Sequence, residues 1–169
     1  MHTAAHLTLL HICFVIFTGA ASANTAAQAE TDDIASKYRV LKWQDLVPGD
    51  WEPPLISPGH DTNRVPRGAV VVELDEVNVT LPGYLKPVKF ENDKVSEFLL
   101  VPFLPHHTRQ HAHLDANQMV YVLLMEPVSV EKPFDPIWVV GTLFTDTVVT
   151  DEGPAAYTIS NAVITDYEY

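Results

Sequence analysis

The sequence predicts an all-β protein, with a small antiparallel OB-like barrel preferred to a β-sandwich. From Ala69 onward, short apolar runs rich in β-branched and aromatic residues follow one another, with turn residues between them. No stretch has the 3.6-residue periodicity of a long amphipathic helix. Strands this apolar in a chain of this size need cover on both faces or closure of the sheet, and closure gives a barrel.

The first 23 residues are predicted to be a cleavable signal peptide. Leu7–Thr18 is almost wholly apolar, and Ala21-Ser22-Ala23 fits the small-x-small rule for signal cleavage. The apolar stretch is shorter than the roughly 20 residues that a membrane span needs. We therefore expect export, a mature chain that starts near Asn24, and no membrane span after cleavage.

The segment that follows is predicted to be irregular before the domain begins. Residues 24–39 are largely Ala-rich and polar without periodicity, which indicates a flexible leader. Residues 40–169 are expected to form a single β-barrel-like domain. Its first element is one short helical turn within Val40–Leu46, docked through Trp43. Trp51–Pro66 holds four prolines, which favours an extended segment over regular structure.

The strands are predicted from alternation and from apolar runs bounded by turn residues. Val70–Leu74 alternates and predicts a first strand, with a hairpin turn at Asp75-Glu76. A second strand begins at Val77 and continues to Phe90, past a bulge or bend predicted at Pro82-Gly83. Further strands are expected at Val95–Phe103, Gln118–Met125, Ile137–Phe144 and Ala156–Ile164, with a turn at Asn92-Asp93.

Composition excludes several classes of function. The net charge of −12 and the absence of a basic stripe argue against a nucleic-acid partner. The single cysteine, Cys13, lies in the predicted signal peptide, so the mature chain has no disulfide, thiolate metal site or cysteine nucleophile. No serine has the glycine frame of a nucleophile elbow. Metal chemistry must therefore use imidazole, carboxylate or water.

The chemically distinctive feature is a histidine-rich segment, Pro105–Asp115, between two predicted strands. It contains four of the five histidines of the predicted mature chain. Imidazole is a common ligand of zinc and copper. His111 and His113 are two residues apart, so in an extended segment they point to the same side. The segment predicts a zinc or copper site with His107, His111 and His113 as ligands and His106 or Asp115 as the fourth.

Other interpretations of this segment stay open. Arg109 opposes a bound cation and favours recognition of a carboxylate or phosphate, which would make the domain a metal-free adaptor of an envelope complex. The spacing His111-x-His113-x4-Gln118 is similar to the first metal motif of the cupins, which allows a cupin-like metalloenzyme, although the cupin glycines and second motif are missing. A solvated, pH-sensitive patch without a ligand is the third alternative.

Short stretches in a fixed order along the chain carry a family resemblance. They are Trp43–Pro48, Leu74-Asp75, Leu81–Tyr84 with Pro87, Phe98–Phe103, Asn117–Val122, Trp138–Leu143 and Ala155–Tyr157. In these stretches, from about Trp43 to Tyr167, the chain resembles the exported bacterial proteins grouped as domain of unknown function 3299. The resemblance implies a periplasmic β domain, in a family commonly associated with metal-handling ABC transport systems, and it implies no particular enzymatic activity.

The histidine segment departs from the pattern of that family. Members typically carry Cys-x-His followed by prolines, between a Val-Pro-aromatic element and an Asn-Gln element. Here the Cys position falls near His107, the His position near Arg109 to His111, and His113-Leu114-Asp115 replaces the prolines. Exchanging Cys for His keeps ligands for borderline metals. We therefore expect a non-enzymatic metal-binding or metal-handling accessory linked to a transport system, with envelope transporter components or metal clients as partners.

Overall fold

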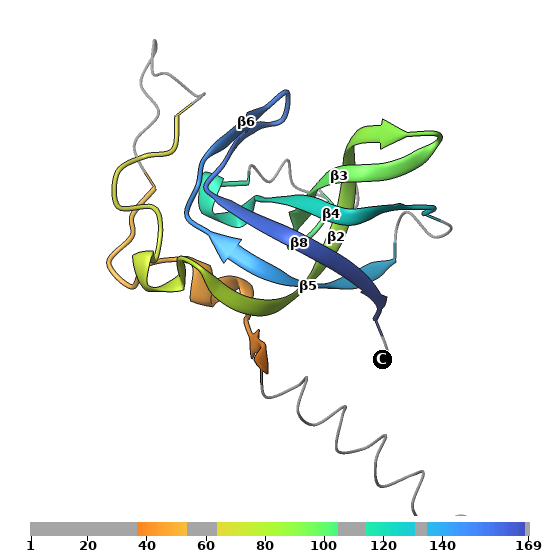
Figure 1. Ribbon diagram of the computed structural model, residues 1–169. Coiled ribbons are helices and arrows are strands. Elements are labelled where there is room, and N and C mark those ends of the chain that lie inside the picture. Colours follow the sequence, from red (N-terminus) through yellow and green to blue (C-terminus); the bar gives the residue numbers. More distant parts are fainter. Residues whose placement is uncertain (1–36, 54–63, 105–113, 131–134, 168–169) are drawn as a thin grey trace, which may run out of the picture. The chain divides into compact units, whose positions relative to one another are not determined.

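Five strands close into a barrel in which each strand pairs with two neighbours (Figure 1). The computed structural model describes residues 37–53, 64–104, 114–130 and 135–167. Within these ranges the pairing order is β2-β3-β4-β8-β5, and β2 pairs with β5 to complete the barrel. The strands are β2 (Val77–Glu91), β3 (Lys94–Val101), β4 (Val120–Val128), β5 (Pro136–Phe144) and β8 (Tyr157–Asp166).

This strand order confirms the predicted OB-like barrel over the alternative sandwich. β2, β3 and β4 form an antiparallel meander, and β8 lies between β4 and β5. β4 and β8 pair in parallel, with Val120 opposite Tyr157 and Val122 opposite Ile159. The barrel is therefore antiparallel except at this one seam, as expected when the fifth strand of an OB-fold returns beside the third.

The long strand β2 belongs to two sides of the barrel. Residues 77–84 pair with β5, and residues 84–91 pair with β3. A Cβ on Gly83, at this change of partner, would lie 2.8 Å from the carbonyl oxygen of Val101, so only glycine fits without a shift. The sequence predicted a bulge or bend at Pro82-Gly83. No bulge lies there, because the register with β5 is continuous through these residues and the register shifts lie between Pro87 and Phe90 instead.

A two-residue turn joins β2 to β3, as the sequence predicts. Its residues, Asn92 and Asp93, have φ values of 49° and 65°. A type I′ turn needs positive φ at both central positions, and short polar side chains tolerate that conformation. The turn therefore sets the hairpin register, in which Glu91 lies opposite Lys94.

The predicted helical turn is present at the start of the domain. It is the 3₁₀ turn η1 (Trp43–Leu46), which follows the short strand β1 (Arg39–Val40) along the edge of β2. The indole Nε1 of Trp43 donates a hydrogen bond of 2.7 Å to the carbonyl of Pro82. Leu46 is fully buried. These two contacts dock the turn on the barrel, as expected for Trp43.

The strand predicted at Val70–Leu74 is wrong, because this segment contains the 3₁₀ turn η2 (Val72–Leu74). Leu74 is buried in the core, whereas Val72 is 63% exposed. The backbone N–H of Val71 donates to the hydroxyl of Tyr157 rather than to a sheet neighbour. The apolar alternation in this segment reflects burial in a turn and not pairing in a sheet.

Alternation along β3 and β4 separates two apolar clusters. Phe98, Leu100, Val120 and Val122 belong to the cluster that fills the barrel. Their neighbours along the strands point to the opposite face. There, together with Ala155 from later in the chain, they form a second cluster, here called the outer-face cluster: Leu99, Val101, Met119, Tyr121 and Ala155.

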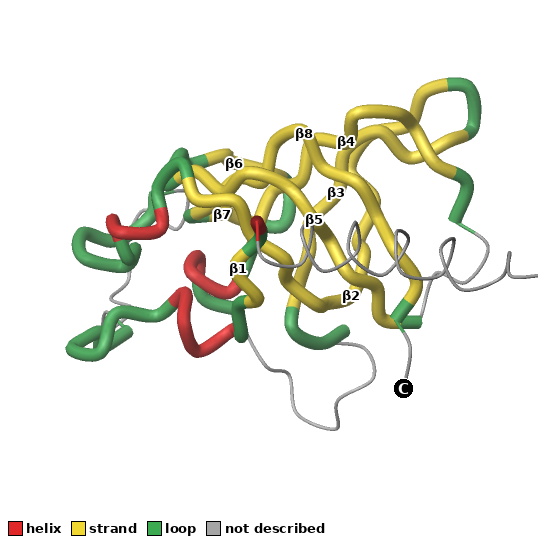
Figure 2. The backbone as a smooth tube through the Cα atoms, turned by 60° about the horizontal axis from the view of Figure 1, so that its bottom comes forward, coloured by secondary structure: helices red, strands yellow, loops and turns green. Residues whose placement is uncertain are grey.

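The remaining short elements gather at one end of the barrel (Figure 2). They include the 3₁₀ turn η4 (Ala116–Gln118) and the hairpin β6 (Val148–Thr150) and β7 (Gly153–Ala155), which the sequence did not predict. The backbone N–H of Ala156 donates to the carbonyl of Ala116, 2.9 Å away, and joins η4 to the chain after β7. This end of the barrel is where β3 finishes and β4 begins.

Candidate functional site

The candidate site is the outer-face cluster together with the histidine segment that borders it. The four predicted histidine ligands, His106, His107, His111 and His113, lie outside the described residues. The structure does describe the residues on either side, Leu104 and Leu114. Both pack against the outer-face cluster, so the described chain on either side of the segment lies beside the same side chains.

The fifth predicted ligand, Asp115, lies directly before η4. Its backbone carbonyl accepts a hydrogen bond of 2.9 Å from the N–H of Gln118. Its side chain is partly exposed and makes no hydrogen bond to cap the turn. Within the described part of the chain, no three His, Cys, Asp or Glu side chains gather closely enough to hold a metal ion. A site that includes Asp115 therefore needs the histidines of the segment, and it stays a prediction.

Asn117 carries a buried side-chain amide and lies two residues after the end of the histidine segment. The residue is 1% exposed, and its Nδ2 donor has no hydrogen-bond partner among the described residues. Leaving such a donor unpaired costs about 1–3 kcal/mol. Asn117 opens the stretch Asn117–Val122, which carries part of the family resemblance.

A polar group continues the outer-face cluster toward the β2–β3 hairpin. The hydroxyl of Tyr121 donates to one carboxylate oxygen of Glu97, and Lys89 Nζ donates to the other at 2.7 Å. Lys89, and then Tyr121, hold the pKa of the Glu97 carboxyl below its usual range. Burial first, and then the bond to Glu97, raise the pKa of Tyr121 to about 12. Lys89 is held protonated by the same carboxylate, which raises its pKa.

This polar group is suited to structure rather than to acid–base catalysis. Both oxygens of the Glu97 carboxylate are engaged, and a general base works best with a pKa near the operating pH. This polar group was not predicted from the sequence. The available signal was a single acidic residue inside an apolar strand, because such a residue needs a partner when the strand is covered.

The β6–β7 hairpin covers the start of β4 on the outer face. Ala155 is fully buried in the cluster, and Val148 packs beside it. A Cβ on Gly153 would lie 3.5 Å from Cε of Met119, which shows how close the hairpin backbone lies to the cluster. Lys86 and Glu152 form an ion pair of 2.5 Å that joins β2 to the tip of the hairpin. The cluster is therefore enclosed by β3, β4, the hairpin and the ends of the histidine segment.

Comparison with known proteins places this architecture in a family. The model of a family described as a protein of unknown function (DUF3299) matches residues 43–166. The chain belongs to the DUF3299 family. The predicted resemblance is thus confirmed.

A solved structure supports the DUF3299 assignment. It is the crystal structure of a DUF3299 family protein from Pseudomonas aeruginosa PAO1, which is 31% identical to this chain. The match covers 78% of this chain and 97% of that chain, with a TM-score of 0.64. The chain matches no curated protein. The DUF3299 match spans the barrel strands, the outer-face cluster and the sequence of the histidine segment.

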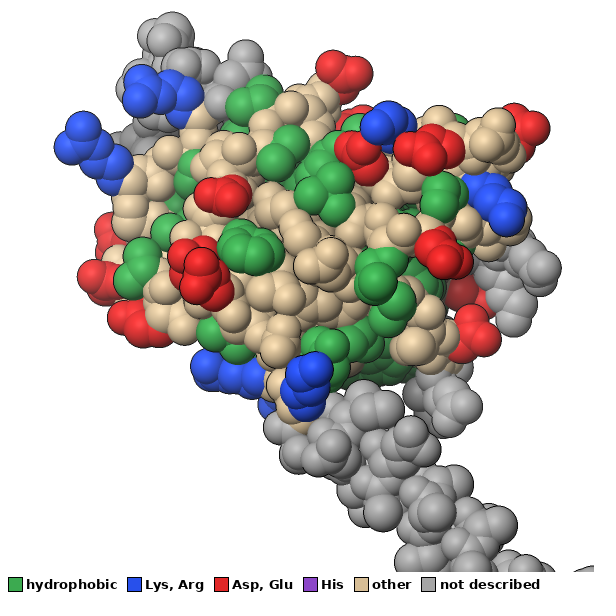
Figure 3. Space-filling model, viewed as in Figure 1, with side chains coloured by type: hydrophobic (Ala, Val, Ile, Leu, Met, Phe, Trp, Pro, Cys, Tyr) green, Lys and Arg blue, Asp and Glu red, His purple; other side chains and the backbone are tan. Residues whose placement is uncertain are grey.

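The surface of this DUF3299 domain is acidic. Asp and Glu side chains are spread over the face shown in Figure 3, and Lys and Arg side chains lie mainly toward its margins. This distribution agrees with the net charge of −12. Over the described ranges, no helix is long and apolar enough to cross a membrane.

Proposed function

We propose that this DUF3299 protein is a non-enzymatic metal-binding or metal-handling accessory that binds zinc or copper. The ligands are His107, His111 and His113, with His106 or Asp115 as the fourth. Three imidazoles and a fourth donor satisfy the tetrahedral preference of zinc, and imidazole also suits copper.

The observation that carries the proposal is the shared anchorage of the two ends of the histidine segment. Leu104 and Leu114 pack against one cluster, so the four histidines are tethered at both ends within a short length of chain. Tethering limits how far the imidazoles can separate before a metal arrives. It thereby lowers the entropy cost of bringing three of them onto one ion.

Charge supports the same proposal. An acidic surface raises the local concentration of cations. Asp115 contributes a carboxylate at the end of the segment that is not used to cap η4. Arg109 acts against a bound cation unless its guanidinium pairs with an acid. The balance of these charges favours a site that exchanges its metal over one that holds it permanently.

The proposed setting is the periplasm, after export and cleavage near Asn24. The apolar Leu7–Thr18 stretch and the small residues after it support export. The partners we propose are envelope transporter components or metal clients. A domain whose proposed ligands all lie within one short stretch of the sequence offers such a partner a single segment to engage.

Calorimetric titration of the mature chain with zinc and with copper tests the proposal. We expect a dissociation constant tighter than ~0.1 mM, about −5.5 kcal/mol, for at least one of the two metals. The double variant His111→Ala/His113→Ala should lose that binding. His60→Ala is the matched control, because His60 is the remaining histidine of the mature chain outside the segment, and it should bind as the parent does.

The second candidate is a metal-free adaptor, and Arg109 is the observation that favours it. Imidazolium and guanidinium groups together recognise carboxylate or phosphate. If neither metal binds more tightly than ~0.1 mM, the metal proposal is overturned. The adaptor would then predict that the double histidine variant loses capture of an envelope partner while its metal content is unchanged.

A further inference from the structure

The outer side of the sheet formed by β2, β5 and β8 carries a face without charged side chains, here called the neutral face. Each of its three rows takes one residue from the first half of β2, one from β5 and one from β8. The rows are Asn78 with Thr142 and Ser160, Thr80 with Val140 and Val163, and Pro82 with Trp138 and Thr165. Figure 3 shows an uncharged area in the middle of its view, over β5 and β8, between the acidic side chains.

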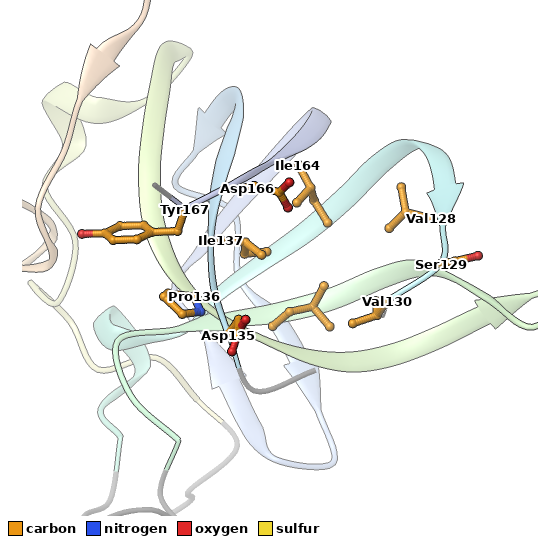
Figure 4. Close-up of a pocket in the computed structure, with 10 residues that line it drawn as sticks. Val128, Ser129, Val130, Asp135, Pro136, Ile137, Ile164, Asp166 and Tyr167 are labelled. Atoms are coloured by element: carbon orange, nitrogen blue, oxygen red, sulfur yellow. The ribbon is translucent and has the colours of Figure 1, made fainter. Parts of the chain in front are cut away.

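Alternation along the strands shows that these rows point away from the barrel core. Val139, next to Val140, is fully buried in the core. Ile137 and Ile164 alternate with the same rows and line a pocket of about 520 Å³ at the end of the barrel where β5 begins (Figure 4). The neutral face therefore lies on the outer surface and is separate from that pocket.

Apolar residues extend the middle row at both ends. Val40 on β1 pairs with Thr80 and is 64% exposed. Met125 directly follows the last pair of the β4–β8 ladder, which places it beside Val163 on the outer side. Met125 is 65% exposed and Val163 is 45% exposed. The order across the sheet is therefore Val40, Thr80, Val140, Val163 and Met125, with Val140 at the centre.

Charge sets the neutral face apart from the other side of the barrel. There the second half of β2 and the strand β3 present Lys86, Lys89 and Glu97. The predicted signal peptide contains no Asp, Glu, Lys or Arg, so the mature chain keeps the net charge of −12. Two copies that approach through acidic surfaces repel each other. A contact through the neutral face reduces that repulsion and buries no unpaired ion.

We propose that the neutral face binds a second copy of this chain, with a two-fold axis near Val140. In such a contact the same patch serves both copies. The axis sets Val40 of one copy opposite Met125 of the other, and Thr80 opposite Val163, so apolar ends meet apolar ends. An acidic or a basic partner would bring charges that this face cannot pair, whereas a second copy brings none. Depletion of charge around apolar side chains is also the usual composition of an interface centre.

The size of the face predicts a weak dimer. Five strands about 4.8 Å apart and three rows about 6.7 Å apart give an area of about 500 Å² per copy. A standard interface buries about 800 Å² per partner. We therefore expect a dissociation constant of about 0.1 mM for the dimer.

Sedimentation equilibrium of the mature chain tests the proposal from about 10 µM to about 1 mM, one decade on either side of that constant. We expect a reversible equilibrium between monomer and dimer. Raising NaCl from about 0.05 M to about 0.5 M should strengthen the dimer at least about twofold, because salt screens the repulsion between two chains of charge −12. A chain that stays monomeric at the highest concentration would overturn the proposal. A dimer that salt dissociates would overturn it too, because that dimer would rest on ion pairs.

A charge-pair experiment locates the contact at Val140. Val140→Asp and Val140→Lys each set two like charges opposite each other at the axis, so each variant should dimerise at least about tenfold more weakly than the parent. Mixed in equal amounts, the two variants should pair with each other about as tightly as the parent. Val149→Asp, which adds the same charge at an exposed position on β6, is the matched control and should leave the dimer unchanged.

Urea denaturation establishes that the two Val140 variants are folded. If both are folded and their mixture does not dimerise, the proposal is overturned. Val163→Asp gives a second test at an exposed position of the same row, for the case in which a Val140 variant does not fold. It should weaken the dimer at least about threefold, and a dimer of unchanged affinity would contradict the proposal.

Discussion

The hydroxyl of Tyr157 donates a hydrogen bond of 2.7 Å to the backbone carbonyl of Leu46. The same oxygen accepts a hydrogen bond of 2.7 Å from the N–H of Val71. Tyr157 is fully buried at the start of β8, so one hydroxyl joins the barrel to η1 and to the segment before η2. Both segments lack sheet partners at these positions, and this hydroxyl supplies the hydrogen bonds that a sheet would have supplied.

Tyr157→Phe should therefore destabilise the domain although it removes only one oxygen atom. The variant leaves the Leu46 carbonyl and the Val71 N–H without this partner, which costs about 1–3 kcal/mol. Urea denaturation at neutral pH measures the effect. Tyr84→Phe is the control, because Tyr84 is partly buried and no hydrogen bond of its hydroxyl is found in the described part of the chain. A stability equal to that of the parent would show that water replaces the hydroxyl.

Glycine at position 83 is expected to be required by the barrel. In Gly83→Ala the new Cβ would lie 2.8 Å from the Val101 carbonyl oxygen and 2.9 Å from the Leu100 side chain. Backbone and a fully buried leucine must shift, which costs about 1–3 kcal/mol. Gly49→Ala is the matched control, since a Cβ there meets nothing within 4 Å, and its change should stay within about 0.5 kcal/mol. Similar denaturation midpoints for both variants would contradict the close approach.

The ion-paired carboxyl of Glu97 predicts a loss of stability in acid. Its pKa is lowered in the folded state, so its contribution to stability is present above the unfolded value, near 4.5, and is lost as the pH falls through the folded pKa. Glu97→Gln removes that titration while its amide oxygen still accepts from Tyr121. The free energy of unfolding should therefore fall less between pH 6 and pH 3 in the variant than in the parent, by roughly 1 kcal/mol or less because Lys89 is exposed.

Urea denaturation across that range checks the Glu97 prediction. Glu126→Gln, which alters an exposed glutamate on β4, is the control and should keep the slope of the parent. If Glu97→Gln and the parent lose stability in parallel, the carboxylate does not couple folding to pH. The comparison of slopes is independent of any constant loss that the substitution itself causes.

The barrel strands could be predicted from the sequence because their residues carry the signal themselves. Phe98 and Leu100 fill the barrel while Leu99 and Val101 are buried on the outer face, so β3 is an apolar run that no half-exposed strand would show. Closure follows from the need to cover both faces. The parallel seam between β4 and β8 could not be predicted, because alternation shows which residues are buried and not which strand lies beside which.

The strand wrongly predicted at Val70–Leu74 and the unpredicted β6–β7 hairpin have causes that the pattern of apolar residues does not show. The Val70–Leu74 segment alternates like a strand, yet the hydrogen bond that fixes it comes from Tyr157, far along the chain. The β6–β7 hairpin has strands of three residues, too short for any periodicity. At the candidate site the histidines are obvious in the sequence, whereas the anchoring of Leu104 and Leu114 on one cluster depends on the folded barrel.

That anchoring gives the last prediction, which links the fold to the proposed function. Leu114→Ala removes part of the contact that ties the end of the histidine segment to the outer-face cluster. If tethering lowers the cost of gathering the imidazoles, zinc affinity should fall by up to about tenfold, or 1.4 kcal/mol, although every ligand is present. Val149→Ala, an exposed apolar side chain on β6, should leave affinity unchanged. Calorimetry gives the affinities, and urea midpoints establish that both variants keep the barrel. Zinc binding that is equally tight in Leu114→Ala would mean that the histidines form their site without help from the cluster.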